Sequence, residues 1–401
     1  MAINLLNKYT VSKEEQVLEE AAEITADESA QLAEDHATLR EEQDNLVQDV
    51  ESTSDDIETA QTAVDQLQEQ NEAITEVAES GEMTPAAAAG FELARRATLA
   101  PLGLDEETQT QAVDEAGLES MVNNKGVVAL KQNQQIIVAL EGAIGDAFAS
   151  FKKKAGEFLF RVGKMLSVLD KRYKEAYKVL KETSDEEFNA KVEKLSNTSG
   201  LRNYLDNGKL VEIKTLTKVF DEFFDDSSSL MALFERTYTQ IVKTSSGDSA
   251  EVDHTKLAQI DEKFVGDVSQ ILDRLVKNSA YIQFGNVHYN LTKTENGLKV
   301  ERKQTAKYTG QASFTRQNLL DALNVGSSYE NLYKFIKNFF NDYEKSLNLV
   351  ETNTDKKATF GYQPTLNSLR VIGKTLVQAY NDLEAMREDY INFAMSFKKA
   401  N

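Results

Sequence analysis

Apolar and small side chains recur every seven residues between residues 32 and 78. The first seam position holds His36, Gln43, Val50, Ile57, Val64, Asn71 and Ala78, and the second, three residues later, holds Leu39, Leu46, Thr53, Ala60, Leu67 and Ile74. This is the a/d spacing of a coiled coil, sustained for about six heptads. The pattern predicts a coiled coil over residues 32–78, preceded by an acidic segment over residues 1–31.

The seam and the outer face of the predicted coiled coil favour different partners. β-Branched residues at a and Leu at several d positions favour a parallel dimer, and Asn71 at an a position is a device that fixes register. No Lys or Arg lies between Arg40 and Arg95, so the outer face is acidic and repels its own copy. Two partners therefore remain open: a second copy of the chain, or a basic helix in this chain or another.

After the seam, turn chemistry at Ser80–Pro85 ends the helix, because Pro85 cannot sit in a helix interior. Residues 79–125 are expected to be a linker with short helices, and residues 126–401 a helical body. Periodicity and capping signals predict helices in this body at 126–181, 185–195, 208–224, 227–243, 255–280, 314–324, 327–350 and 365–399. The helices at 208–224 and 227–243 are expected to be joined around Asp225–Ser229.

One segment of the body departs from the helical pattern. Val287–Thr294 and Leu298–Gln304 are strand-like, and Asn296-Gly297 lies between them. Asn-Gly flanked by such runs is the strongest short signal for a β-hairpin. The sequence thus predicts a small hairpin near residues 286–304.

Composition agrees with a mainly α fold. The chain of 401 residues has 3 Pro, 19 Gly and 28% charged residues, which favours long helices over a turn-rich β fold. It has no Cys, which excludes disulfides, thiolate metal sites and a cysteine nucleophile. No run of about 18 apolar residues and no apolar signal segment is present, so neither a membrane span nor secretion is expected.

Charge is distributed unevenly along the chain. Residues 1–120 hold 30 acidic and 5 basic side chains, whereas residues 121–401 hold 36 acidic and 40 basic ones. All aromatic residues except Tyr9 and Phe91 lie after residue 120. The distribution indicates an acidic helical segment attached to a near-neutral folded body.

No residue pattern indicates catalysis. The three histidines, His36, His254 and His288, lie in no metal-binding spacing, and nucleotide-binding and nucleophile motifs are absent. With 66 acidic residues, any choice of a catalytic carboxylate pair would be arbitrary. We therefore expect no enzymatic activity, cofactor, metal ion or small-molecule substrate.

Basic side chains suggest a weak nucleic-acid contact. They form two groups, Lys152, Lys153 and Lys154 on a predicted helix, and Lys299, Arg302 and Lys303 on the second predicted strand. Each phosphate neutralised by such residues adds salt-dependent affinity. Because basic and acidic residues are nearly balanced after residue 120, an ordinary solvated surface is the more economical interpretation.

An acidic helical N-terminal segment followed by a near-neutral, Cys-free helical domain resembles the internal head proteins of large tailed bacteriophages. The resemblance is one of architecture and implies a non-enzymatic virion protein, present in the host cytoplasm during assembly and then packaged inside the head. Its implied partners are capsid or prohead core proteins and packaged DNA.

The resemblance also implies trimming by a prohead protease that cuts after Glu, in giant phages within a pattern of a small residue, any residue and Glu. Candidate cuts follow Glu119, Glu82 and Glu23, and Glu157 ranks last because it lies in a predicted helix. A cut after Glu119 falls at the charge boundary and would make the acidic segment a propeptide.

Two alternatives use the same features differently. In the first, the chain is an unprocessed scaffold or assembly protein whose coiled coil is the working part. In the second, it is a helical protein that acts on membranes or at a surface, which the acidic charge opposes because anionic lipid repels it.

Overall fold

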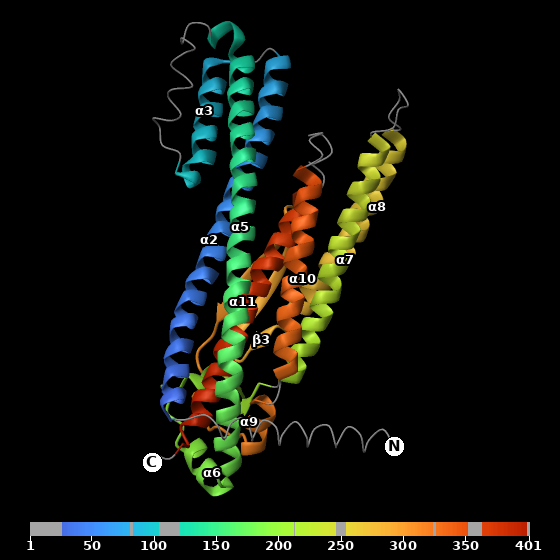
Figure 1. Ribbon diagram of the computed structural model, residues 1–401. Helices are drawn as coiled ribbons and strands as arrows, with labels where there is room; N and C mark the ends of the chain where they lie inside the picture. The colour runs from blue at the N-terminus through green and yellow to red at the C-terminus, as the bar shows by residue number, and fades with distance from the viewer. Residues whose placement is uncertain are drawn as a thin grey trace. The chain divides into compact units, whose positions relative to one another are not determined.

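The computed structural model describes residues 26–80, 83–103, 121–211, 213–245, 254–323, 326–351 and 363–398. In these residues the protein is mainly helical, as the sequence predicts, and it has two small antiparallel sheets where the sequence predicts a single hairpin (Figure 1). The helices are α2 (Ala26–Glu79), α3 (Pro85–Leu99), α5 (Met121–Glu182), α6 (Asp185–Glu193), α7 (Ile213–Ser245), α8 (His254–Ser279), α9 (Arg316–Leu323), α10 (Gly326–Glu351) and α11 (Gln363–Met395), with short 3-10 helices η1 (Ala100–Leu102) and η2 (Gly200–Tyr204).

The chain forms two compact units, and the long helices α2 and α5 contribute to both. Unit 1 comprises Met1–Val47 and Ala155–Asn401, and unit 2 comprises Gln48–Lys154. Each unit is described by itself below.

Unit 2 is built from residues 48–79 of α2, α3, η1 and residues 121–154 of α5. The aliphatic seam residues of α2 are buried here, with Ile57 and Leu67 fully inaccessible to solvent. Seam residue Asn71 accepts a 2.9 Å hydrogen bond from Asn133 of α5, and Thr53 accepts one of 3.0 Å from Lys154. Within unit 2 the predicted seam is therefore covered by the chain itself, and α5 supplies polar partners for Asn71 and Thr53.

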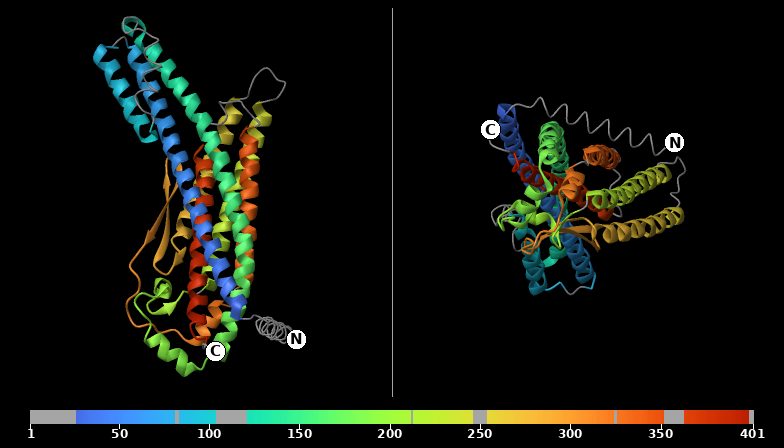
Figure 2. Two further views of the ribbon diagram at one scale, coloured as in Figure 1. Left: turned by 60° about the vertical axis from the view of Figure 1, so that its left-hand side comes forward. Right: turned by 90° about the horizontal axis from the view of Figure 1, so that it is seen from below.

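Unit 1 is organised around α11, which lies among the other helices of the unit (Figure 2). From Thr365 to Ala394 every side chain of α11 except Asn392 is buried or half-buried. The helix packs against β5, α10, α7, α9 and η2. A helix that is covered all round belongs to the core of a protein.

The predicted hairpin is present and packs on both α8 and α11. Its strands β4 (Val287–Thr294) and β5 (Gly297–Gln304) pair antiparallel in the register Thr294 to Gly297, and the short strand β3 (Gln283–Phe284) extends the sheet. The turn residues are Glu295 and Asn296, one position earlier than the Asn-Gly signal places them. A second sheet pairs β1 (Leu205–Asp206) with β2 (Lys209–Leu210).

The prediction of two helices joined around Asp225–Ser229 is wrong, because α7 runs unbroken through that segment. Ser227 is buried and donates a 2.7 Å hydrogen bond to the Phe223 carbonyl oxygen, so its hydroxyl is satisfied within the helix. Asp226 accepts a 2.7 Å hydrogen bond from Arg274 of α8, which gives this polar run a tertiary partner. Both contacts allow turn-like residues to continue a helix.

Candidate functional site

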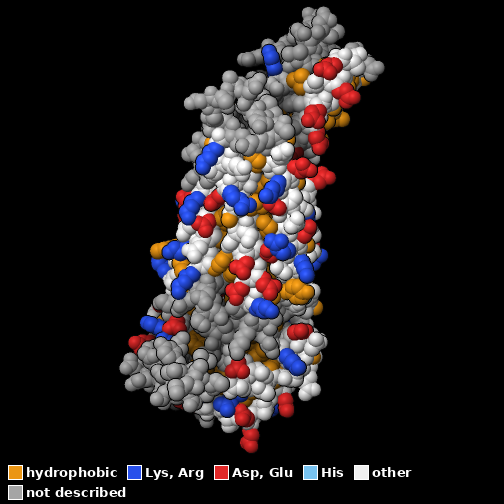
Figure 3. Space-filling model, turned by 90° about the vertical axis from the view of Figure 1, so that its right-hand side faces the viewer, with side chains coloured by type: hydrophobic (Ala, Val, Ile, Leu, Met, Phe, Trp, Pro, Cys, Tyr) orange, Lys and Arg blue, Asp and Glu red, His pale blue; other side chains and the backbone are white. Residues whose placement is uncertain are grey.

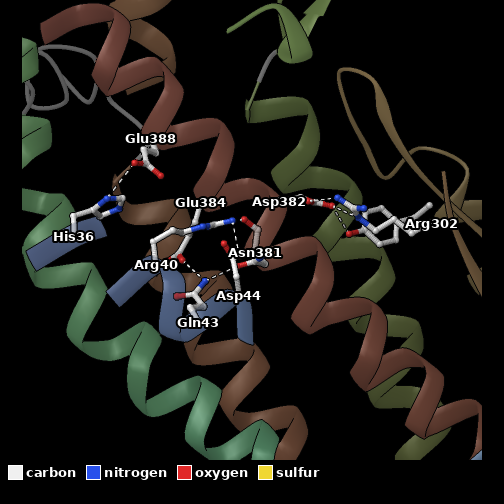
Figure 4. A network of polar contacts seen from close by, with 10 residues as sticks. His36, Arg40, Gln43, Asp44, Arg302, Asn381, Asp382, Glu384 and Glu388 are labelled. Carbon is white, nitrogen blue, oxygen red and sulfur yellow. Dashed lines mark hydrogen bonds and ion pairs between the residues drawn. The ribbon is translucent and has the colours of Figure 1, made fainter. Parts of the chain in front are cut away.

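Polar side chains on the buried helix α11 require partners, because an unpaired polar group in a protein interior is costly. Residues 26–47 of α2 supply many of these partners within unit 1. The contacts form a polar network between the two helices, which Figure 4 shows from close by. This network is the candidate functional site of the protein.

The centre of the network joins three residues of α2 to two of α11. The Gln43 amide nitrogen donates to Asn381 Oδ1 at 2.9 Å and to Glu384 Oε2 at 2.5 Å. Arg40 donates to the Asn381 carbonyl oxygen at 3.1 Å, and the Asn381 amide donates to Asp44 at 2.8 Å. Gln43 and Glu384 are 0% and 1% exposed, so desolvated polar groups take part in docking α2 here, beside the buried Val47.

One turn away, His36 of α2 meets Glu388 of α11. His36 Nδ1 lies 3.3 Å from Glu388 Oε1, and the His36 side chain is 2% exposed. Burial raises the pKa of Glu388, but the hydrogen bond and charge of His36, with Arg172 and Arg40, outweigh it, so this pKa is lowered overall. The carboxylate form of Glu388 is therefore the stable one in this position.

Two other carboxyl groups of α11 shift in the opposite direction. Burial raises the pKa of Glu384 to about 7, although the Gln43 hydrogen bond and the Arg40 charge act against that rise. Burial, and then the charge of Glu388, raise the pKa of Asp389 to about 6. The helix thus carries carboxyl groups of unlike acidity, which the different partners of each explain.

On another side of α11, Asp382 anchors the hairpin. Arg302 of β5 donates to the two Asp382 oxygens at 2.9 and 2.7 Å, and the Tyr289 hydroxyl of β4 donates to the same carboxylate. Burial, followed by the charge of Asp382, raises the pKa of Tyr289 well above its usual range. A two-pronged Arg–carboxylate pair of this kind fixes orientation as well as distance.

This arrangement can dock helices and take up or release protons. Within the described residues, no group of three or more His, Asp or Glu side chains is placed to hold a metal ion. The network itself consists of contacts between helices that involve titratable side chains.

The three favoured cleavage positions, after Glu119, Glu82 and Glu23, lie outside the described residues. Glu157 lies in α5, with an exposed side chain. The processing hypothesis therefore stays a prediction at each of these positions.

The basic residues singled out in the sequence lie on two elements in different units. Lys152, Lys153 and Lys154 are on α5 in unit 2, and Lys299, Arg302 and Lys303 are on β5 in unit 1.

Lys154, Lys303 and Arg302 each have an acidic neighbour. Lys154 lies 3.8 Å from Asp49, Lys303 lies 2.8 Å from Glu301, and Arg302 holds Asp382. On the face drawn in Figure 3, Lys and Arg side chains alternate with Asp and Glu. The nucleic-acid contact stays a prediction, and Arg302 has a structural role in the hairpin anchor.

Sequence reasoning did not identify Asn381, Glu384 or Glu388 as functional residues. The signal that could have found them is the break in the seam at His36 and Gln43, where polar residues replace aliphatic ones at a positions. Such positions need polar partners, and a polar side chain on the apolar stripe of the last predicted helix is a suitable one.

No protein-family model, curated protein or solved structure matches this chain. None of the described helices has a stretch long and apolar enough to cross a membrane.

Proposed function

We propose that this protein is a non-enzymatic structural protein of a phage virion, carried inside the head, in which α2 remains a permanent part of the folded chain. The virion role rests on the architectural resemblance of an acidic helical segment ahead of a near-neutral helical body. The permanence of α2 rests on its burial.

The buried seam of α2 is the observation that supports its permanence in the folded chain. Val50, Ile57, Leu67 and Ile74 are each at most 1% exposed, and burying such a side chain contributes about 1.5–3 kcal/mol. Gln43 adds hydrogen bonds to α11 at the other end of the helix. Removing α2 would expose this apolar surface and leave buried polar groups of α11 without partners.

Proteolysis alone therefore does not release the acidic segment. A cut after Glu119 would break the chain between α3 and α5, but it would leave the side-chain contacts of α2 intact. We propose that a chain cut there persists as two fragments held together without a covalent link.

The same burial favours this proposal over the scaffold alternative. A scaffold that works through the α2 seam needs the seam to be open to another chain. Here the aliphatic seam positions from Val50 to Ile74 face their own chain. Only the acidic outer face of α2 is left for an external partner.

Mass spectrometry of mature particles tests the proposal. Peptides from residues 26–103 and from residues 121–398 are expected at equal molar abundance, whether or not the chain is cut after Glu119. An intact-mass measurement on the same sample distinguishes a cut chain from an uncut one. Loss of the peptides from residues 26–103 would show that α2 is discarded, and absence of the protein from particles would refute the virion role.

A further inference from the structure

The two halves of α2 are held by different chemistry. Residues 48–79 lie in unit 2 with aliphatic seam residues buried. Residues 26–47, which we call the strap, lie in unit 1, and their buried seam positions are His36 and Gln43. Apolar contacts do not respond to pH, whereas contacts to carboxyl groups do.

We infer that docking of the strap on α11 is linked to proton uptake, so that the strap is held tightly in mild acid and loosens as the pH rises toward 8. The inference rests on the contacts of the strap with α11, and it holds whether or not the protein belongs to a virion.

The geometry places a carboxyl group where the strap seals it from water. Glu384 is 1% exposed, and the strap residue Gln43 covers it with a direct hydrogen bond. Undocking the strap would remove Gln43 and Arg40 and return Glu384 to solvent. The free-energy cost of removing the ionised Glu384 carboxylate from water therefore contributes to the docking equilibrium.

Charged and titratable groups face this carboxyl cluster from each element packed around it. They are His36, Arg40 and Asp44 on α2, Arg172 and Glu175 on α5, Tyr204 on η2, Lys307 after β5, and Tyr380, Asp382, Arg387, Glu388 and Asp389 on α11 itself. The positive charges moderate the rise in the pKa of Glu384 without cancelling it.

The raised pKa of Glu384 determines how the stability of the docked strap depends on pH. In the docked protein the pKa of Glu384 is about 7, whereas the pKa of a solvated glutamate is about 4.3. The docked form therefore binds more protons, and its stability falls as the pH rises between these values. The raised pKa of Asp389 also makes the docked form less stable as the pH rises. The lowered pKa of Glu388 has the opposite effect on stability, but only in stronger acid.

Hydrogen exchange on the full chain at pH 5.5 and pH 8.0, corrected for the intrinsic rate, tests the inference. Opening of the strap amides is expected to rise about 10- to 30-fold between the two values. The amides of residues 57–74 in the other half of the same helix serve as the internal reference. Burial, and then the charge of Glu69, raise the pKa of Asp65 in that half, so a smaller change in the same direction is expected there. Equal changes in the two halves would mean unfolding of the whole molecule and would overturn the inference.

Two variants identify the group responsible. Glu384→Gln imitates the protonated acid, so the strap should stay protected at pH 8.0 and lose most of its pH dependence. Asp389→Asn should remove a smaller part of the pH dependence. It provides a second measurement if the first variant does not fold. Glu186→Gln, on the exposed side of α6, is the matched control and should behave as the wild type. A wild-type pH response in Glu384→Gln would refute the assignment.

Discussion

At the scale of single residues, Asp382 shows how α11 holds the hairpin. Its carboxylate accepts hydrogen bonds from Arg302 and from the buried hydroxyl of Tyr289. Removing the shared acceptor leaves two donors without a partner, which costs more than the net value of either bond. Ion pairs at the surface, such as that of Lys303 with Glu301, cost little to lose.

Asp382→Ala should therefore lower the free energy of unfolding by about 3 kcal/mol, because both donors stay partly buried. Lys303→Ala, on the same strand as Arg302, should change it by less than about 0.5 kcal/mol. Urea unfolding of each variant measures both values. Similar losses in the two variants would mean that Asp382 is not the anchor.

At the scale of elements, the periodic pattern predicted where helices run better than where they pair. The heptad pattern of α2 and the hairpin signal near Asn296 both correspond to observed elements. The partner of α2 could not be read from its own sequence, because any apolar helix can cover an a/d seam. The unbroken helix α7 was missed because Asp226 and Ser227 find partners that only the folded chain supplies.

The hairpin also depends on a glycine at the start of β5. Gly297 has φ +106°, and a Cβ there would lie 2.3 Å from the Pro364 carbonyl oxygen of α11. Gly297→Ala should therefore destabilise the protein by about 2 kcal/mol.

Gly266→Ala is the matched control for that change. Gly266 lies in α8, and apart from its chain neighbours and the nearby backbone of the helix, no atom would lie within 4 Å of a Cβ at this position. The control should raise stability by about 0.5–1 kcal/mol, since alanine is the better helix former. Thermal unfolding compares the two variants, and a neutral Gly297→Ala would contradict the close approach of hairpin and helix.

At the scale of the whole molecule, the division by charge and the division by packing do not coincide. The sequence separates an acidic segment from a body near residue 120, whereas each compact unit draws on both sides of that point. Composition could not reveal this, because a helix with an acidic outer face can still bury its seam. The polar network of α11 was equally hidden, since its members lie more than 330 positions apart from their α2 partners.

Separate expression of residues 1–119 and 120–401 in one cell tests this view. The two fragments should purify as a complex that survives 1 M salt, where the screening length is about 3 Å, because the seam contacts are apolar. Ile57→Asp in the shorter fragment should abolish the complex by placing a charge in the buried seam. Thr62→Asp, an exposed position on the same helix, should not. Fragments that separate without any substitution would contradict the permanence of α2.

The central position of α11 has a consequence for synthesis on the ribosome. All other described elements of unit 1 leave the ribosome before α11, the helix on which β5, α10, α7, α9 and η2 pack. All of unit 2 is made by residue 154, but the core of unit 1 is incomplete until residue 395. At 5–20 residues per second this interval lasts roughly 10–50 seconds. During it, the parts of α7 and α10 that pack against α11 lack this covering helix, so nascent chains stalled before residue 363 should require chaperones to stay in solution.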